Sequence, residues 1–179
     1  MRCLSVETLP TVDQLNLGLL LLRVVVGPVF AFHGFAKICR GGRLAGTAGW
    51  FDSIGMRPGY LHARLAAGGE LATGAGLTLG LLTSLAGLGM VALMAVAVWT
   101  VHRGSGLLVT KNGWEYNLVL AAVGVAVATI GPGQWSLDDV VGIDLNGPTG
   151  FVISLVGGIA AAALVLGTSH RPPAPAHAA

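Results

Sequence analysis

Charged residues are scarce in this sequence. Only 10% of its 179 residues are Asp, Glu, Lys or Arg, whereas 54% are hydrophobic. Soluble domains carry roughly 25% charged residues, so a water-soluble globule of this composition would lack the polar surface to cover itself. The net charge is only +2, without the basic excess typical of nucleic-acid binding. The composition therefore excludes a soluble domain, argues against a nucleic-acid partner and indicates an integral membrane protein in contact with the lipid bilayer.

Cysteine is nearly absent as well. The two cysteines, Cys3 and Cys39, form no C-x-x-C motif, and the topology predicted below places them on opposite sides of the membrane. A thiol–disulfide relay needs a cysteine pair that exchanges electrons, so this chemistry is excluded within one chain. The residues before the first apolar run also lack the basic region and small-residue cleavage site of a signal peptide. We therefore expect the first run to remain as a helix.

Long hydrophobic runs are what the sequence does contain, and there are five, separated by breaks that contain Gly or Pro. A helix of ~20 apolar residues crosses a ~30 Å hydrocarbon core. Barrel strands are shorter and alternate in polarity, so these runs are predicted to be helices. We predict an all-α fold: a transmembrane four-helix bundle with an additional C-terminal transmembrane helix, in one domain over residues 15–168. The predicted spans are residues 15–35, 62–82, 85–102, 114–130 and 149–168.

Basic residues are concentrated in the loops after the first and third runs and in the tail. The opposite side holds Arg2 and an acidic loop with Asp138, Asp139 and Asp144. This bias predicts that the basic side faces the cytoplasm, with the N-terminus outside and the C-terminus inside. Residues 1–14 then form an extracytoplasmic segment, and the Pro/Ala-rich residues 169–179 a disordered cytoplasmic tail.

Several ionisable residues fall within or at the ends of the predicted spans, where they are costly and usually face a partner or a cavity. Arg23 lies in the middle of the first run, and Glu70 lies about two turns into the second. We predict an Arg23–Glu70 ion pair, which either locks two helices together or forms the floor of a polar pocket for an anionic or quinone-like ligand. The candidates for this pocket are Arg23, His33, Lys37, Glu70, His102, Glu115 and Tyr116.

No metal site is predicted. His33 and His102 could approach each other from helix ends on the same side, but neither belongs to an H-x-x-x-H or E-x-x-H motif. Histidines without such spacing are more often hydrogen-bonding or interfacial groups than metal or haem ligands.

Small residues recur every four positions along the second run. Small side chains let helix backbones approach closely in lipid, within a bundle or between subunits. We expect this stripe to pack inside the bundle in preference to an interface with another subunit. Its members are Gly68, Ala72, Gly76, Gly80 and Ser84.

The order of motifs over most of residues 17–139 resembles the DoxX family of small bacterial membrane proteins. The motifs are R-x9-H-G-x2-K in the first run, then GWFDSIGM, GGELATGAGLTLGLLT, NGWEYNLVL and GPGQWSLDD. The resemblance implies a four-helix membrane core, sometimes with an added helix, in the bacterial cytoplasmic membrane. It marks as characteristic the positions Arg23, His33, Lys37, Glu70, Glu115 and Tyr116.

Members of the DoxX family are linked to membrane redox systems, including a thiosulfate:quinone oxidoreductase and a mycobacterial oxidative-stress complex. The resemblance therefore implies a subunit associated with a respiratory or oxidative-stress redox complex. The sequence itself shows no electron carrier, so we expect no intrinsic cofactor, and partner subunits would have to supply electrons. A quinone is the ligand expected in the polar pocket, where His33 or Glu70 would exchange protons with it. The alternative that stays open is a non-catalytic structural or assembly subunit of a larger membrane complex.

Overall fold

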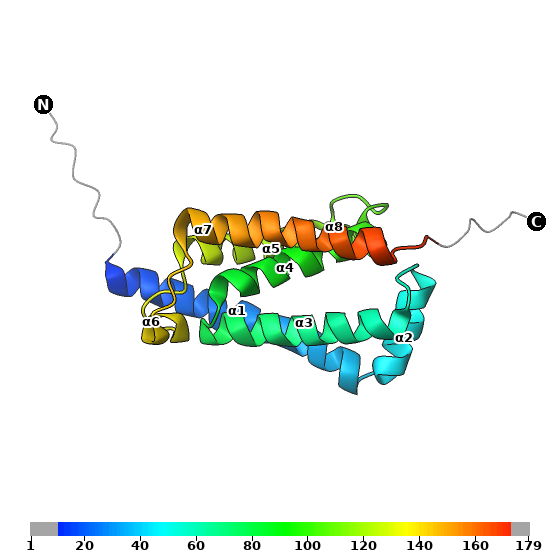
Figure 1. The fold of residues 1–179 in the computed structure, drawn as a ribbon, viewed down its shortest axis with the longest axis horizontal. Helices are drawn as coiled ribbons and strands as arrows, with labels where there is room; N and C mark the ends of the chain where they lie inside the picture. The colour runs from blue at the N-terminus through cyan, green and yellow to red at the C-terminus, as the bar shows by residue number, and fades with distance from the viewer. Residues whose placement is uncertain (1–10, 173–179) are drawn as a thin grey trace, which may run out of the picture.

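The computed structural model describes residues 11–172, and the regular elements in this range are helices. Four long helices form a core, a fifth follows, and short helices lie at the two ends (Figure 1). The predicted all-α, membrane-type fold is confirmed. The core helices are α1 (Val12–Cys39), α3 (Gly59–Leu79), α4 (Thr83–Ala97) with its π-helical continuation η1 (Val98–His102), and α5 (Glu115–Ile130). The fifth helix is α7 (Gly147–Phe151), η3 (Val152–Gly157) and α8 (Gly158–Ser169), and the short elements are α2 (Arg43–Ser53), η2 (Val109–Lys111) and α6 (Leu137–Val141).

The helices are arranged as two packed groups. Helix α1 lies against α3, whereas α4 packs against α3, α5 and α8 (Figure 1). Helix α2 lies at one end of the molecule and α6 at the other, and these are called the α2 end and the α6 end below. A buried core of Phe30, Leu77, Met90, Leu120 and Val127 joins the four core helices.

Three helices of the described chain are long and apolar enough to cross a membrane: Val12–Cys39, Thr83–His102 and Gly147–Ser169. Helix α5 is apolar but has only 16 residues. Helix α3 has 21 residues, yet its sequence includes His62, Arg64 and Glu70 together with many Gly and Ala residues, which lower its hydropathy. It is therefore the long helix least suited to face lipid on all sides.

Glycines set the contact between α1 and α3. A Cβ atom on Gly34 would lie 2.6 Å from the carbonyl oxygen of Ala67, and one on Gly27 would lie 2.8 Å from that of Gly74. Only glycine permits this approach of two helix backbones. The contact fixes the antiparallel register, in which Arg23 lies level with Gly80 at the α6 end.

The predicted small-residue stripe on α3 does not pack inside the bundle along its whole length. A Cβ atom on Gly68 would meet nothing within 4 Å, and Ala72 is exposed, so the prediction is wrong for these two positions. Gly76 approaches the carbonyl of Leu81, Gly80 ends the helix with a φ of 63°, and Ser84 donates a hydrogen bond to the carbonyl of Leu145. The face of α3 that packs on α1 carries Ala67 and Gly74 instead, because the stripe lies on a different side of the helix.

The end of α8 is tied to the loop between α2 and α3. The amide of Arg57 donates to the carbonyl of Ser169 (3.0 Å), and the amide of Arg171 donates to the carbonyl of Gly55 (2.7 Å). Residues 169–171 were predicted to be part of a disordered tail, but these hydrogen bonds hold them against the bundle. Residues 173–179 of that tail, and residues 1–10 of the N-terminal segment with Cys3, lie outside the described residues.

Candidate functional site

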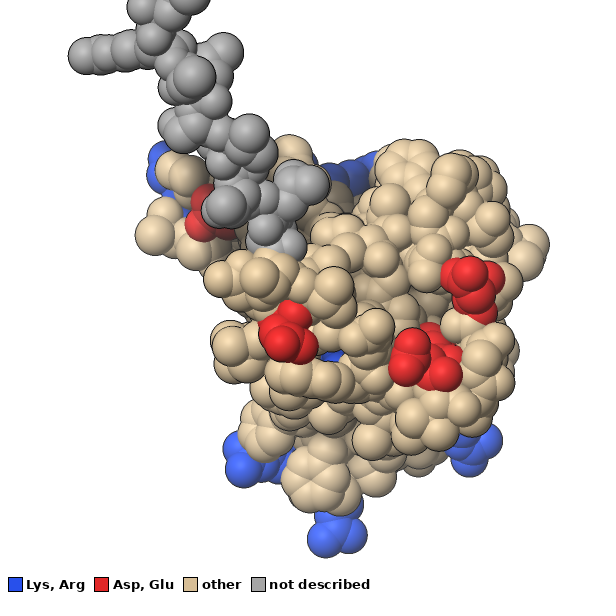
Figure 2. Space-filling view, turned by 90° about the vertical axis from the view of Figure 1, so that its left-hand side faces the viewer, with Lys and Arg blue, Asp and Glu red and all other residues tan. Residues whose placement is uncertain are grey.

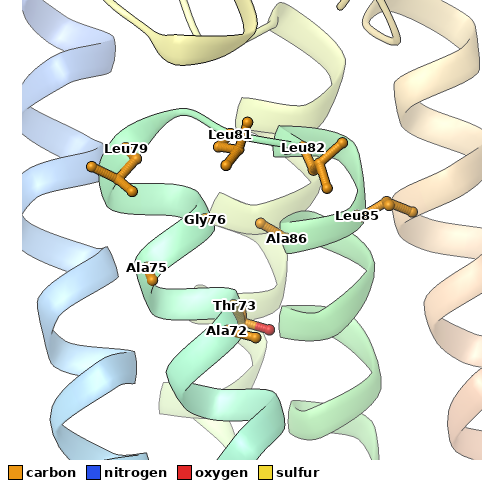
Figure 3. Close-up of a pocket in the computed structure, with 9 residues that line it drawn as sticks. All are labelled: Ala72, Thr73, Ala75, Gly76, Leu79, Leu81, Leu82, Leu85 and Ala86. Carbon is orange, nitrogen blue, oxygen red and sulfur yellow. The ribbon is translucent and has the colours of Figure 1, made fainter.

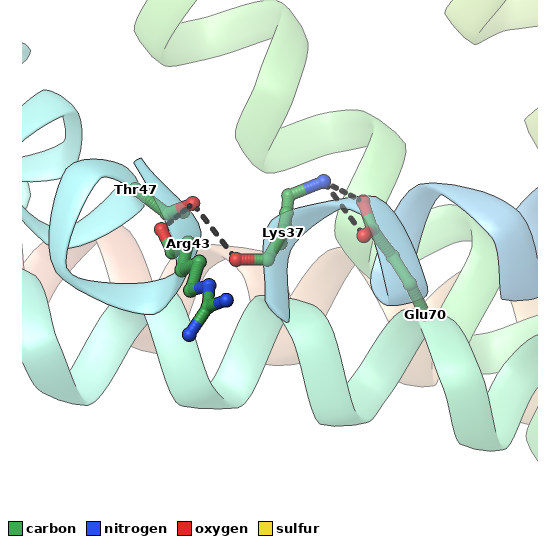
Figure 4. A network of polar contacts seen from close by, with 4 residues as sticks. All are labelled: Lys37, Arg43, Thr47 and Glu70. Carbon is green, nitrogen blue, oxygen red and sulfur yellow. Dashed lines mark hydrogen bonds and ion pairs between the residues drawn. The ribbon is translucent and has the colours of Figure 1, made fainter. Parts of the chain in front are cut away.

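Within residues 11–172, a salt bridge joins Lys37, near the end of α1, to Glu70 on α3 (Figure 4). The Lys37 Nζ atom lies 2.7 Å from Oε1 and 2.6 Å from Oε2 of Glu70. The two side chains are 23% and 11% exposed. The pair is thus largely removed from water, and its two charges are held together by two charge-assisted hydrogen bonds.

The predicted Arg23–Glu70 ion pair is wrong. Arg23 instead donates a hydrogen bond to the carbonyl of Trp135, at the α6 end. The physical reason is register: Glu70 lies near the level of His33, whereas Arg23 lies level with Gly80, about 15 Å further along the axis of α3. In addition, α1 continues past the predicted end at residue 35 to Cys39, which places Lys37 inside the helix and within reach of Glu70.

Arg23 is buried where the loop before α6 closes the bundle. Its residue exposure is 1%, and Asp138 lies nearby, because the Asp138 amide donates to the carbonyl of Gly80 (2.8 Å), the residue beside the Arg23 guanidinium. The Asp138 carboxylate also accepts hydrogen bonds from the amides of Leu82 (2.7 Å) and Thr83 (2.9 Å) at the start of α4. The loop that leads into α6 and the first turn of α6 are therefore bonded to Arg23 within α1, to Gly80 at the end of α3 and to the start of α4, an arrangement that holds these helices together.

His33 is the second ionisable group beside Glu70. It is exposed on α1, and the next residue, Gly34, packs against Ala67 and Leu71 on either side of Glu70 in the sequence of α3. The backbone near Lys37 is held from the other side by α2, because the Thr47 hydroxyl donates to the carbonyl of Lys37 (3.2 Å) and also to that of Arg43 (Figure 4). Lys37, Glu70 and His33 together form what we call the Lys37–Glu70 site.

The other predicted pocket residues make different contacts. His102 Nδ1 lies 2.8 Å from the carbonyl oxygen of Asn112, and Glu115 accepts a hydrogen bond from the amide of Val109 (2.8 Å). Both contacts stabilise the loop between η1 and α5. The Tyr116 side chain is 44% exposed. The structure thus brings Lys37, Glu70 and His33 together and gives His102, Glu115 and Arg23 partners elsewhere.

Two hollows lie away from the Lys37–Glu70 site. One, of about 420 Å³, is at the α6 end, where the start of α1 faces the loops around α6. Figure 2 looks onto this end and shows acidic side chains gathered on it. The other is an apolar groove of about 310 Å³ between α3 and α4, near the turn that joins them (Figure 3). No group of three or more His, Cys, Asp or Glu residues within residues 11–172 could hold a metal ion.

The sequence analysis missed two polar partners at the α6 end. Asn16, buried in the first apolar run, accepts a hydrogen bond from the amide of Gln134 (2.9 Å) and donates one to its side chain (3.1 Å). Asp138 caps α4 across a long stretch of sequence. Asn16 was detectable as a polar residue in an apolar run, where a partner is expected. The groups that Asn16 and Asp138 bind are distant in the sequence, so only the tertiary structure identifies them.

The sequence model of the DoxX family matches residues 18–103, just under half of the chain. The match covers most of α1 and continues through η1, so it includes both members of the Lys37–Glu70 pair. It confirms the resemblance to the DoxX family over this stretch and supports a membrane protein. Searches of curated proteins and of solved structures gave no match.

Proposed function

From the DoxX match, we propose that this protein is a membrane subunit of a respiratory or oxidative-stress redox complex and that the Lys37–Glu70 site binds the headgroup of a quinone. The observation that carries the proposal is the Lys37–Glu70 ion pair with exposed His33 beside it. Intramembrane ionisable groups are costly and usually serve a partner, a proton path or a ligand.

The hydrogen-bonding capacity of the site fits a quinone. A lysine ammonium has three N–H donors, and the Lys37 group uses two of them on Glu70. One donor is left for a quinone carbonyl oxygen, next to a cation that favours negative charge on that oxygen. A bound quinone accepts electrons and protons when it is reduced. A partner subunit would supply the electrons, whereas His33 and Glu70 are positioned to hold or pass protons.

Equilibrium binding of a short-chain quinone analogue to the purified protein in lipid nanodiscs tests the proposal. Wild type should bind saturably, and Glu70→Gln and Lys37→Met should each weaken binding about tenfold or more, which corresponds to ~1.4 kcal/mol. Asp139→Asn is the matched control, because Asp139 is exposed on α6 and remote from the site. Absence of saturable binding, or equal binding by all four proteins, would show that the Lys37–Glu70 site is not a quinone site.

A second function, a non-catalytic assembly subunit, is favoured by the polar contacts of Arg23, Asp138 and Asn16, which hold helix ends together. The double variant Lys37→Met/Glu70→Leu separates the two functions, since it removes the ionisable groups and leaves apolar side chains in their place. If its co-purification with native membrane partners is unchanged but their quinone-dependent activity falls, the redox proposal is supported. If partners and activity are both unchanged, the assembly function is supported.

A further inference from the structure

Three exposed arginines at the α2 end each hold the guanidinium group over an aromatic ring. The three pairs come from the ends of three different helices, and we call them the arginine–aromatic pairs. Measured from the guanidinium carbon to the ring centroid, they are Arg40–Phe32 (4.8 Å), Arg64–Tyr60 (5.6 Å) and Arg103–Trp99 (4.6 Å). A cation within ~6 Å of a ring centroid is attracted by the ring face, and this attraction uses none of the N–H donors of the guanidinium group.

The pairs place their guanidinium groups where the apolar surface of each helix ends. Arg40 follows the last residue of α1 and turns back over a ring eight residues earlier, and Arg103 follows η1 and turns back over a ring four residues earlier. Arg64 lies one turn further into α3 than Tyr60 and turns toward the helix start. The three rings are 49–51% exposed, and two of them belong to helices apolar enough to cross a membrane. Arg side chains and aromatic rings so placed are typical of the membrane–water interface.

The arginines of these pairs lack an acidic partner within residues 11–172, because none of the three forms a salt bridge there. The acidic groups at this end have other partners. Glu70 is paired with Lys37, and Asp52 and Glu115 each accept a hydrogen bond from a backbone amide (2.8 Å). The three guanidinium groups therefore keep their positive charge and their N–H donors for an acceptor outside the chain.

We infer that the arginine–aromatic pairs bind the phosphate groups of anionic phospholipids around the α2 end. The planar fork of a guanidinium group matches a phosphate, and basic residues near a membrane surface favour anionic headgroups. A lipid is the occupant because the guanidinium groups lie on rings exposed at the sides of membrane-type helices. Figure 2, a view along the long axis of the molecule, shows Lys and Arg side chains projecting beyond the sides of the bundle, where lipid surrounds a membrane protein. This inference is independent of the quinone proposal.

Native mass spectrometry of the delipidated full chain in mild detergent, titrated with one phospholipid at a time, tests the inference. Wild type should bind phosphatidylglycerol with a dissociation constant about fivefold lower than that for phosphatidylcholine, the factor for ~1 kcal/mol per arginine near an anionic lipid. Replacing the three paired arginines by neutral side chains should remove this preference. The test variant is Arg40→Gln/Arg64→Gln/Arg103→Gln. Equal affinity of wild type for the two lipids would overturn the inference.

The matched control removes three other exposed basic residues of the same end, none of which lies over a ring in the described chain. It is Arg43→Gln/Lys111→Gln/Arg171→Gln, which changes the net charge by the same amount. The control should keep most of the preference for phosphatidylglycerol. Because all six substituted residues are exposed, both variants should fold, which circular dichroism checks. Equal loss of the preference in both variants would mean a general attraction to a basic surface and would overturn the inference.

Two further arms test the rings and the lipid as the source of the phosphate. The variant Phe32→Leu/Tyr60→Leu/Trp99→Leu keeps every charge and should lower the preference for phosphatidylglycerol about twofold or more, because the arginines are no longer held on rings. An unchanged preference would contradict the inference. Inorganic phosphate in excess, at constant ionic strength, should leave the lipid bound to wild type. Displacement of the lipid would show that free phosphate is the ligand and would overturn the assignment to phospholipid.

Discussion

Lys37 and Arg23 are both cations on α1, but among the described residues Lys37 forms a salt bridge and Arg23 does not. Lys37 is bonded to both oxygens of one carboxylate, whereas Arg23 donates to a backbone carbonyl with Asp138 nearby. When a charge is buried, removing its partner leaves an uncompensated ion and is more damaging than removing the whole pair. The two sites should therefore respond differently to single and double substitutions, and the Lys37–Glu70 pair gives the clearer case because both members are side chains.

Lys37→Met alone should destabilise the protein by about 3 kcal/mol, because Glu70 would remain as a largely buried carboxylate without a cation. The double variant Lys37→Met/Glu70→Leu should recover most of this loss, since no charge remains. Reversible unfolding in mixed detergent micelles measures the free energies, and a double-mutant cycle isolates the coupling. Additive effects of the two single substitutions would contradict a direct ion pair.

At the scale of helices, glycine contacts decide how closely the elements pack. On α3, a Cβ atom at position 74 would collide with backbone atoms of Ala31 and Gly27, which cannot move away as a flexible side chain can. Gly68 on the same helix has no such neighbour. Glycines that appear equivalent in the sequence thus have different roles, depending on which side of the helix they occupy.

Gly74→Ala should destabilise the bundle by about 2 kcal/mol, in the range found for overpacking, because α1 and α3 must separate to accept the methyl group. Gly18→Ala, on an exposed side of α1, should be neutral or stabilising by up to about 1 kcal/mol, since alanine is the better helix former. Detergent unfolding of both variants gives the comparison, and equal stability of the two would contradict the observed α1–α3 contact.

The hydrogen bonds between the end of α8 and residues 55–57 should protect the donating amides of Arg57 and Arg171 from exchange. Truncation after Thr168 removes the Ser169 carbonyl that accepts from the Arg57 amide, so exchange there should speed up by about tenfold, the factor for ~1.4 kcal/mol. Truncation after Pro172 keeps the contact and is the control. Hydrogen–deuterium exchange measured on a peptide that includes Arg57 makes the comparison, with unchanged rates in both truncations as the contrary result.

Whether a feature could be predicted from the sequence depends on how far apart the interacting residues lie along the chain. The all-α membrane fold follows from apolar runs, because backbone hydrogen bonding in lipid leaves few alternatives. The predicted partner of Glu70 was wrong because the depth of each residue in the membrane was counted from residue 35 as the end of the first helix. In the structure, α1 extends to Cys39, and glycine contacts set its register with α3. The capping of α4 by Asp138 joins residues more than fifty positions apart, and no local pattern indicates it.

For the molecule as a whole, the two ends differ in charge. The α6 end carries Asp139 and Asp144 on its surface, and acidic side chains gather there in Figure 2. At the α2 end, basic residues predominate in the loops and helix ends: Arg40, Arg43, Arg57, Arg64, Arg103, Lys111 and Arg171. Loops rich in Lys and Arg are retained in the cytoplasm during insertion, whereas acidic residues contribute little to orientation. The α2 end should therefore face the cytoplasm.

Cysteine labelling in intact cells tests this orientation with one natural and one introduced thiol. In a Cys3→Ser background, Cys39 is exposed at the α2 end, so a membrane-impermeant maleimide should label it only after the cells are opened. In a Cys3→Ser/Cys39→Ser background, Asp144→Cys places a thiol on the exposed loop of the α6 end. The same maleimide should label this thiol in intact spheroplasts. Labelling of Cys39 before opening, with protection of Asp144→Cys, would mean the reverse orientation. It would also place the Lys37–Glu70 site in the outer half of the membrane, where its proton exchange would be with the exterior.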